Sequence, residues 1–245
     1  MKKQFNQDVF DLLYTKKGVL FDLDGTMIPT NDLWYKVDLD YFRNHGILID
    51  AETLHKDKMD ALKACANSSD LYVATFDRLN KQYGIDKSGH DSLAEIMDLA
   101  FDRQVNLNYK PTVAPFLHQL KQDNFKMGLV TMTTKEALDV YRYWNQEIKN
   151  SADMNEIFGD NFVTTEDVAK DKRKPHPDSY LKMLDMLELN ASECIVFEDS
   201  PEGVEAGRRA GMDTVLIYDD FWKERYHELE QMTPYRIHSY DELTK

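Results

Sequence analysis

The sequence has few cysteines and no long hydrophobic stretch. Its 245 residues include two cysteines, Cys65 and Cys194, which lie far apart in the chain. Two separated thiols provide neither a disulfide framework nor a zinc cluster, and they suit a reducing compartment. A membrane span needs about 18 consecutive apolar residues, and no run of that length is present. Gln, Asn and Asp also interrupt the apolar residues near the N-terminus, so we expect a cytoplasmic protein without a secretion signal.

Positive charge is scarce as well. Thirty Lys and Arg residues stand against 44 Asp and Glu residues, which leaves a formal net charge of -14. A chain with this charge repels other polyanions, so we expect neither nucleic acid nor an anionic membrane as a partner. If the substrate is an anion, a metal ion and a few lysines must gather positive charge locally. The composition favours no particular oligomeric state.

Several glycine and histidine motifs are missing too. The ten glycines form no G-x-S-x-G elbow, P-loop or G-x-G-x-x-G fingerprint, and the seven histidines include no H-E-x-x-H pair. These absences argue against a serine hydrolase, a nucleotide-binding loop and a zinc peptidase. Hydrophobic residues nevertheless make up 42% of the chain, which is enough for a sizeable core.

Five short apolar runs are typical of strands that are buried on both faces. They comprise residues 18–24, 126–131, 161–164, 194–199 and 213–217. Helical spacing of apolar residues lies between them at 135–149, 178–189 and 201–210, the last with Ser200 as its predicted N-cap. Strands that alternate with helices predict an α/β fold with a doubly wound parallel sheet. In such a sheet sites form at the carboxyl ends of strands, so the polar residues that end the first, second and fourth runs should meet in one crevice.

Residues 31–108 break this alternation. They contain no clear buried strand, and their apolar spacing predicts four helices, at Leu33–Asn44, Thr53–Cys65, Leu71–Tyr83 and Asp91–Gln104. We therefore expect an all-helical insert over 31–108, within an α/β core made of 1–30 and 109–245.

The strongest chemical signal is the segment Phe21-Asp-Leu-Asp-Gly-Thr26 at the end of the first apolar run. Two carboxylates at a strand end repel each other unless a cation lies among them or one is protonated, and Mg²⁺ prefers oxygen ligands of this kind. One carboxylate can attack phosphorus while the other protonates the leaving group. An Asp-Gly turn is the plain structural alternative. A calcium loop is excluded, because Met27 and Leu33 occupy the positions where it needs glycine and glutamate.

Three later segments carry weaker signals. Thr131 ends the second run, where its hydroxyl could bind phosphoryl oxygens or simply cap the strand. Lys174, in Lys-Pro-His-Pro-Asp178, offers a point charge for a phosphate or belongs to a solvated basic run, and Asp178 can cap the next helix. Glu198 and Asp199 end the fourth run. Capping of the next helix would explain one acid at this place, whereas metal ligation would explain both.

Together these segments resemble the haloacid dehalogenase-like hydrolase superfamily. The resemblance covers residues 18–30 and most of 109–217, through DLDGT, a hydrophobic run ending in threonine, KPHPD and FEDSPEGVEAGRRAGM. The last string is similar to the branch that contains β-phosphoglucomutase and small sugar-phosphate phosphatases. The resemblance implies a Rossmann-like core, with a helical cap where the insert lies.

The resemblance also implies a role for each matching residue. Asp22 would be the nucleophile that forms an aspartyl-phosphate, and Asp24 would act as general acid and then base. Thr131 would bind the phosphoryl group, and Lys174 would neutralise the nucleophile and the phosphate.

The same resemblance implies a Mg²⁺ site. Its ligands would be the Asp22 carboxylate, the main-chain carbonyl of Asp24 and the Asp199 carboxylate, with Glu198 acting nearby through water.

The resulting hypothesis is a Mg²⁺-dependent phosphatase that acts on a small phosphorylated metabolite. Halide-displacing relatives need no acid at the position of Asp24, so its presence favours phosphate esters. Mutase relatives carry a histidine ten residues after that position, where this chain has Trp34, and Pro29 replaces an acid that often follows the DGT motif. A β-phosphoglucomutase-like phosphosugar mutase and a non-catalytic phosphate-binding regulator are the two alternatives.

Overall fold

The computed structural model describes residues 6–244, which divide into two compact units. One unit is Asp32–Val105, and the other contains the rest of the described chain. The predicted insert, 31–108, differs from the first unit by one residue at its start and three at its end. Residues 1–5 and 245, which the prediction assigned to the core, lie outside the described part.

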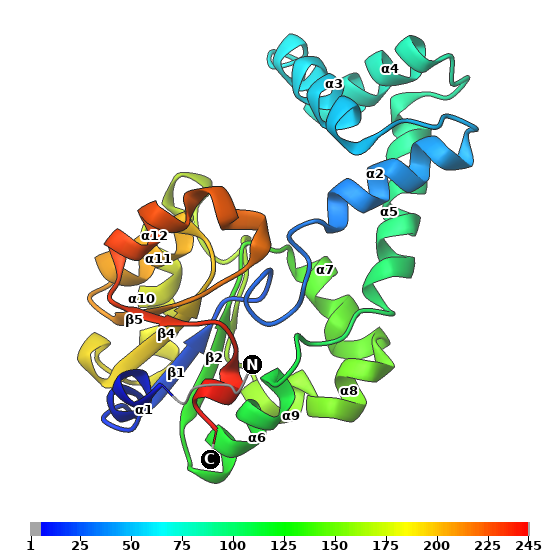
Figure 1. The fold of residues 1–245 in the computed structure, drawn as a ribbon. Coiled ribbons are helices and arrows are strands. Elements are labelled where there is room, and N and C mark those ends of the chain that lie inside the picture. The colour runs from blue at the N-terminus through cyan, green and yellow to red at the C-terminus, as the bar shows by residue number, and fades with distance from the viewer. Residues whose placement is uncertain (1–5, 245) are drawn as a thin grey trace. The chain divides into compact units, whose positions relative to one another are not determined.

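The described part of the core unit is built on a six-stranded sheet in which every pairing is parallel. Its order is β3-β2-β1-β4-β5-β6, the order of a doubly wound dinucleotide-binding fold. The chain moves outward from β1 to β3 and then returns to β4, so the switch point of the topology lies between β1 and β4 (Figure 1). The strands are β1 Gly18–Phe21, β2 Lys126–Val130, β3 Phe162–Val163, β4 Cys194–Glu198, β5 Asp213–Ile217 and β6 Tyr235–Ile237.

The five strands expected from the apolar runs are all present, and the fold class is confirmed. The predicted third strand shortens to two residues, and the edge strand β6 was not predicted, because three residues with one buried side chain leave no periodic signal.

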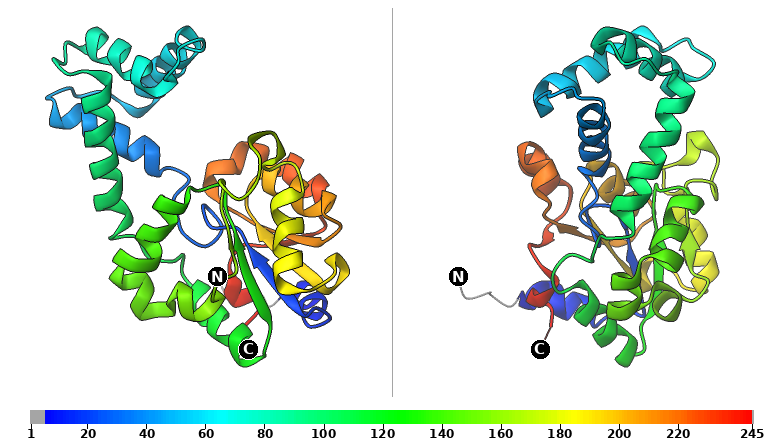
Figure 2. Two further views of the ribbon diagram at one scale, coloured as in Figure 1. Left: turned by 180° about the vertical axis from the view of Figure 1, so that it is seen from behind. Right: turned by 90° about the vertical axis from the view of Figure 1, so that its right-hand side faces the viewer.

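Helices cover both faces of the sheet (Figures 1 and 2). Those of the core unit are α1 Gln7–Leu13, α6 Val113–Gln122, α7 Lys135–Asp139, α8 Gln146–Ala152, α9 Met154–Phe158, α10 Asp178–Leu187, α11 Pro201–Arg209 and α12 Tyr226–Met232. The single helix expected over 135–149 is instead α7 and α8, separated by a π-helical turn at Val140–Trp144. The predicted cap Ser200 is confirmed, since its side chain accepts from the N–H of Gly203. Asp178 does not cap α10, because it is the first helical residue and Pro177 occupies the N-cap.

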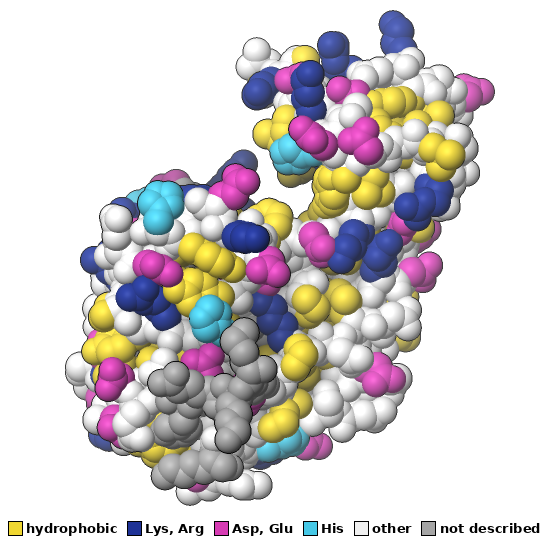
Figure 3. Space-filling model, in the orientation of Figure 1, with side chains coloured by type: hydrophobic (Ala, Val, Ile, Leu, Met, Phe, Trp, Pro, Cys, Tyr) yellow, Lys and Arg dark blue, Asp and Glu magenta, His cyan; other side chains and the backbone are white. Residues whose placement is uncertain are grey.

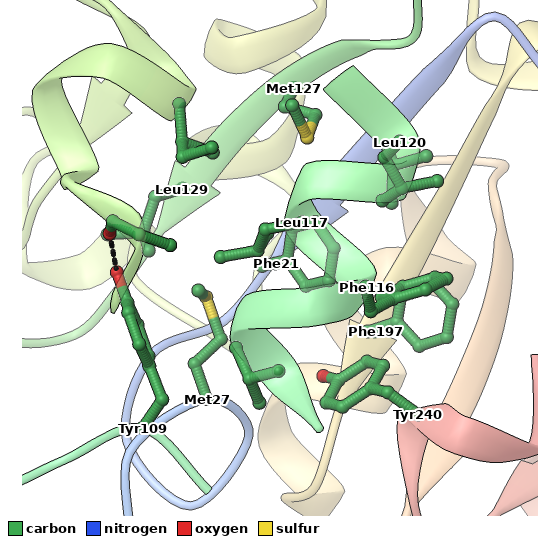
Figure 4. Close-up of a cluster of buried hydrophobic side chains, with 14 of the residues drawn as sticks. Phe21, Met27, Tyr109, Phe116, Leu117, Leu120, Met127, Leu129, Phe197 and Tyr240 are labelled. Atoms are coloured by element: carbon green, nitrogen blue, oxygen red, sulfur yellow. Dashed lines mark hydrogen bonds between the residues drawn. The ribbon is translucent and has the colours of Figure 1, made fainter. Parts of the chain in front are cut away.

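The alternation of strand side chains creates two core layers. On one face, Phe21 of β1 stacks on Phe197 of β4 with ring centroids 5.4 Å apart, and Phe116 of α6 and Tyr240 complete the cluster (Figure 4). On the other face, Leu20 packs with side chains of α10 and α11. Because Asp22 follows β1 directly, these layers fix the strand end that carries it.

The unit Asp32–Val105, which is fully described, contains four helices as predicted. They are α2 Leu33–Asn44, α3 Ala51–Ala64, α4 Leu71–Tyr83 and α5 Gly89–Gln104. The bounds of α2 and α4 match the prediction. Helices α3 and α5 each begin two residues earlier, because the side chains of Asp50 and Ser88 accept hydrogen bonds from the first turn.

The described helices include none that is both long and apolar enough to cross a bilayer. On the face of the molecule in Figure 3, Lys and Arg side chains lie among Asp and Glu side chains in both units. On this face, the acidic side chains are therefore dispersed and not gathered in one patch.

Candidate active site

A buried lysine joins the ends of β1 and β4. Lys174 Nζ lies 2.7 Å from Asp22 Oδ1 and 2.7 Å from Glu198 Oε1, and it also donates to the carbonyl of Val130 at 2.8 Å. The Lys174 side chain is 3% exposed and that of Glu198 is fully buried. Burial alone would lower the pKa of Lys174, but the two carboxylates outweigh it and raise that pKa. The ammonium is therefore held in its charged form between two acids that come from distant parts of the sequence.

Glu198 is saturated with hydrogen bonds. Its Oε1 accepts from Lys174 and from the hydroxyl of Tyr180 at 2.7 Å. Its Oε2 accepts from the backbone N–H of Asp199 at 3.2 Å and from Ser200. A Cβ placed on Gly203 would lie 1.9 Å from the Glu198 carboxyl group, so only glycine lets the first turn of α11 pack against it. Glu198 thus holds Lys174 and the start of α11 in place.

Asp22 and Asp199 complete the acidic cluster. Asp22, Glu198 and Asp199 each offer a carboxylate oxygen, and these oxygens all lie within 4.8 Å of one another. Burial, followed by Glu198, Asp199 and Asp24, raises the pKa of Asp22 well above its usual value, although Lys174 opposes the shift. Burial and the charge of Glu198 raise the pKa of Asp199 to about 7. One ammonium does not balance three carboxylates, so further positive charge is needed to hold all three ionised.

Asp24 is half-buried and held by threonine hydroxyls. Thr30 donates to Oδ1, and Thr133 donates to Oδ2. Thr131 also points at Oδ2, from 3.4 Å, while its own oxygen accepts from the N–H of Thr133 at 3.0 Å. Thr131 therefore caps the turn after β2 and lies beside Asp24, and its role in binding a phosphoryl group stays a prediction.

The structure brings the sequence-predicted residues together at the carboxyl ends of β1, β2 and β4. It also adds residues that the sequence did not mark. Thr30 and Thr133 fix Asp24, Tyr180 fixes Glu198, and Thr26 and Asn31 donate to Asp199. Thr26 belongs to the DLDGT motif, which could have drawn attention to it, whereas the others have no sequence signal of their own.

A hard divalent cation fits this donor set. The cluster offers only oxygen ligands, as Mg²⁺ prefers, and its surplus of carboxylates is what a divalent cation would neutralise. Within residues 6–244 the Asp24 carbonyl accepts no backbone hydrogen bond, which leaves a further oxygen available.

Comparison with known proteins agrees with this geometry. The family model for haloacid dehalogenase-like hydrolases matches residues 19–217. The chain is 30% identical over 207 residues to validoxylamine A 7'-phosphate phosphatase of Streptomyces hygroscopicus subsp. limoneus, covering 80% of this chain and 83% of that protein. It is 27% identical over 210 residues to pyrophosphatase PpaX of Bacillus mycoides, covering 81% and 82% of the two chains.

A solved structure shows the same fold. It is that of a Thermotoga maritima protein provisionally named a β-phosphoglucomutase, with a TM-score of 0.72, 23% identity, and coverage of 93% of this chain and 96% of that one. Since the family model spans more than half of the sequence and the site residues of its motifs converge in space, the chain belongs to the haloacid dehalogenase-like hydrolase family.

Proposed function

We propose that this protein is a Mg²⁺-dependent phosphatase that hydrolyses a small phosphorylated metabolite through an aspartyl-phosphate. The observation that carries the proposal is Lys174, whose ammonium lies 2.7 Å from Asp22 at a buried strand end. A carboxylate in that position is oriented and partly neutralised, as an attacking group on an anionic phosphate must be.

Asp22 acts as the nucleophile. Among residues 6–244 only Lys174 donates a hydrogen bond to its carboxylate, at Oδ1, so the second oxygen can form the bond to phosphorus. The P–O bond of the ester breaks in line with the attack, and Asp24 gives its proton to the departing oxygen. Asp24 then takes a proton from water, the hydroxide attacks the aspartyl-phosphate, and the P–O bond to Asp22 breaks to release phosphate.

Asp22, Asp199 and the Asp24 carbonyl would hold Mg²⁺, with Glu198 acting through water because its oxygens already accept several hydrogen bonds. When bound, the cation would stabilise negative charge on the transferring phosphoryl group. The positive charge of Lys174 stabilises the same phosphoryl group. Thr131 lies beside Asp24, and from there the Thr131 hydroxyl can bind a phosphoryl oxygen. The names of the two curated relatives, a pyrophosphatase and a phosphatase, support this reaction class.

The proposal is tested by a screen of phosphorylated metabolites with Mg²⁺ and with EDTA. We expect phosphate release that depends on the cation and stops on chelation. Phosphate release at the same rate in EDTA would contradict the metal requirement, and no release from any ester would favour a binding role. A hexose 1-phosphate with a trace of its bisphosphate tests the mutase alternative, which predicts isomer forming faster than free phosphate.

Cation binding should weaken as pH falls below about 7. The pKa of Asp199 is raised to about 7, so this carboxyl is protonated below that pH and a proton competes with the cation. The proton on Asp199 alone should raise the Mg²⁺ dissociation constant about tenfold for each pH unit below this pKa, and a proton on Asp22, whose pKa is also raised, would add to the rise. Isothermal titration calorimetry below, at and above this pKa measures the trend, and proton release follows from comparing buffers of different ionisation enthalpy. A constant affinity across this range would show that no such proton is displaced.

The same shift has a matching effect on stability. Between pH 3.8, the usual pKa of an aspartate, and about pH 7, the folded protein without cation binds more protons at Asp199 than the unfolded chain does. The contribution of this group to the free energy of unfolding is therefore present at low pH and declines as pH rises through that range.

A further inference from the structure

Uncharged groups donate hydrogen bonds to both carboxylate oxygens of Asp199. Thr26 Oγ1 donates to Oδ1 at 3.0 Å, and Oδ2 accepts from Asn31 Nδ2 at 2.7 Å and from the indole Nε1 of Trp222 at 2.9 Å. The Asp199 side chain is buried. Neutral donors fix the orientation of a carboxylate without cancelling its charge, so the negative charge stays available for a cation.

A second pair of residues fixes Asn31. The Asn31 amide nitrogen also donates to Asp219 Oδ1 at 3.1 Å, and Asp219 Oδ2 accepts from Lys110 Nζ at 2.6 Å. Burial would raise the pKa of Asp219, but the hydrogen bond and charge of Lys110 outweigh it, so that pKa is lowered. Asp219 is therefore an anion paired with Lys110, and it holds the amide of Asn31 turned toward Asp199.

The turn after β1 leaves room for Asn31 to reach Asp199. Lys110 also donates to the carbonyl of Gly25, which ties the turn after β1 to the segment before α6. Gly25 has φ +78°, and a Cβ there would lie 2.0 Å from Asn31 Nδ2 and 2.1 Å from Asp199 Oδ2. The bond from Asn31 to Asp199 thus passes directly over a position that only glycine can occupy.

Trp222 contacts Asp199 from the 3₁₀ helix Asp220–Arg225, which follows β5. Its ring packs against the small cluster of Val204, Leu216 and Leu229, so the indole is anchored while its N–H points at the carboxylate. The indole N–H therefore donates to Asp199 from a packed position, which places the ring next to that carboxylate.

We propose that Asn31 and Trp222, with Asp219 and Lys110 behind Asn31, are positioning residues that hold Asp199 in the orientation needed to bind a divalent cation. The inference rests on the proposed function only in taking Asp199 as a cation ligand. Partners of this kind typically contribute about 10- to 100-fold to metal affinity.

The test is Mg²⁺ binding to the full chain without substrate, followed by isothermal titration calorimetry. Trp222→Phe replaces the indole with a smaller aromatic ring that has no N–H, and Asn31→Ala removes the amide. Each should raise the Mg²⁺ dissociation constant about 10- to 100-fold. Trp144→Phe makes the same chemical change at a side chain that is 64% exposed and should leave the affinity unchanged.

Two further measurements separate positioning from general damage. Asp219→Asn should weaken Mg²⁺ binding in the wild-type background but have little further effect in Asn31→Ala, because Asp219 acts through Asn31. Mg²⁺ should also change the tryptophan emission of the wild type and of Trp144→Phe, but not that of Trp222→Phe. Circular dichroism shows which variants fold. If either Trp222→Phe or Asn31→Ala does not fold, the Mg²⁺ affinity of the other variant tests the proposal.

Dissociation constants within about twofold of wild type in the folded variants would overturn the proposal, because positioning partners are worth more than that. A wild-type chain that binds no divalent cation would also overturn it. Normal Mg²⁺ binding without hydrolysis of any phosphate ester would contradict the proposed phosphatase activity alone and leave the positioning role intact.

Discussion

Asp22→Asn is expected to abolish phosphate release. The amide has the size and shape of the carboxylate, but it has no anionic oxygen with which to attack phosphorus. Removing a nucleophile that acts together with its partners can lower kcat by about 10⁴-fold or more. The measurement is Mg²⁺-dependent hydrolysis of p-nitrophenyl phosphate. An ester that carries radioactive phosphorus should also label the wild type transiently, as its alcohol is released, and fail to label the variant.

The matched control is Asp11→Asn, which makes the same change at an exposed residue of α1. It should leave kcat unchanged. If Asp22→Asn instead retained a large part of the wild-type rate, Asp22 could not be the nucleophile, and water or another side chain would have to attack.

The second large effect concerns folding stability. Lys174→Met should lower the free energy of unfolding by about 3–5 kcal/mol, because it leaves Asp22 and Glu198 buried without their ammonium. Urea unfolding in the presence of EDTA measures the change without a contribution from bound cation. Adding Glu198→Gln to this variant should restore part of the loss, since it removes one of the two unpaired charges.

Lys172→Met provides the comparison. Lys172 is exposed two residues before Lys174, and its replacement should change stability by less than about 0.5 kcal/mol. A loss for Lys174→Met no larger than that of an exposed ion pair, about 1 kcal/mol or less, would mean that water or protons already compensate the carboxylates.

The sheet and the main acidic residues could be predicted because their signals are local. Buried parallel strands are continuous apolar runs, and the topology places the polar residues at their carboxyl ends in one crevice. Asp22, Lys174, Glu198 and Asp199 do meet there, although they come from three distant segments. The helices of Asp32–Val105 were similarly clear from apolar spacing, and their caps explain the small differences at α3 and α5.

The surroundings of Asp199 could not be predicted in this way. Asn31, Lys110 and Trp222 are far apart in the sequence. They lie in a turn, an irregular segment and a short 3₁₀ helix, where no apolar periodicity marks a residue. Their partners are set by how the loops after β1 and β5 pack, which is a tertiary property. The π-helical turn at Val140–Trp144 was missed for a related reason, since its apolar spacing differs little from that of a continuous helix.

The cluster of three carboxylates, of which two contact the one ammonium, also has a kinetic consequence. A phosphate ester that approached these acids before any cation had bound would meet a net negative charge and be repelled. In the proposed mechanism we therefore expect Mg²⁺ to bind first and the ester second. With that order, raising the ester concentration would not replace a shortage of cation, and the concentration of Mg²⁺ would set the fraction of the protein that can bind the ester.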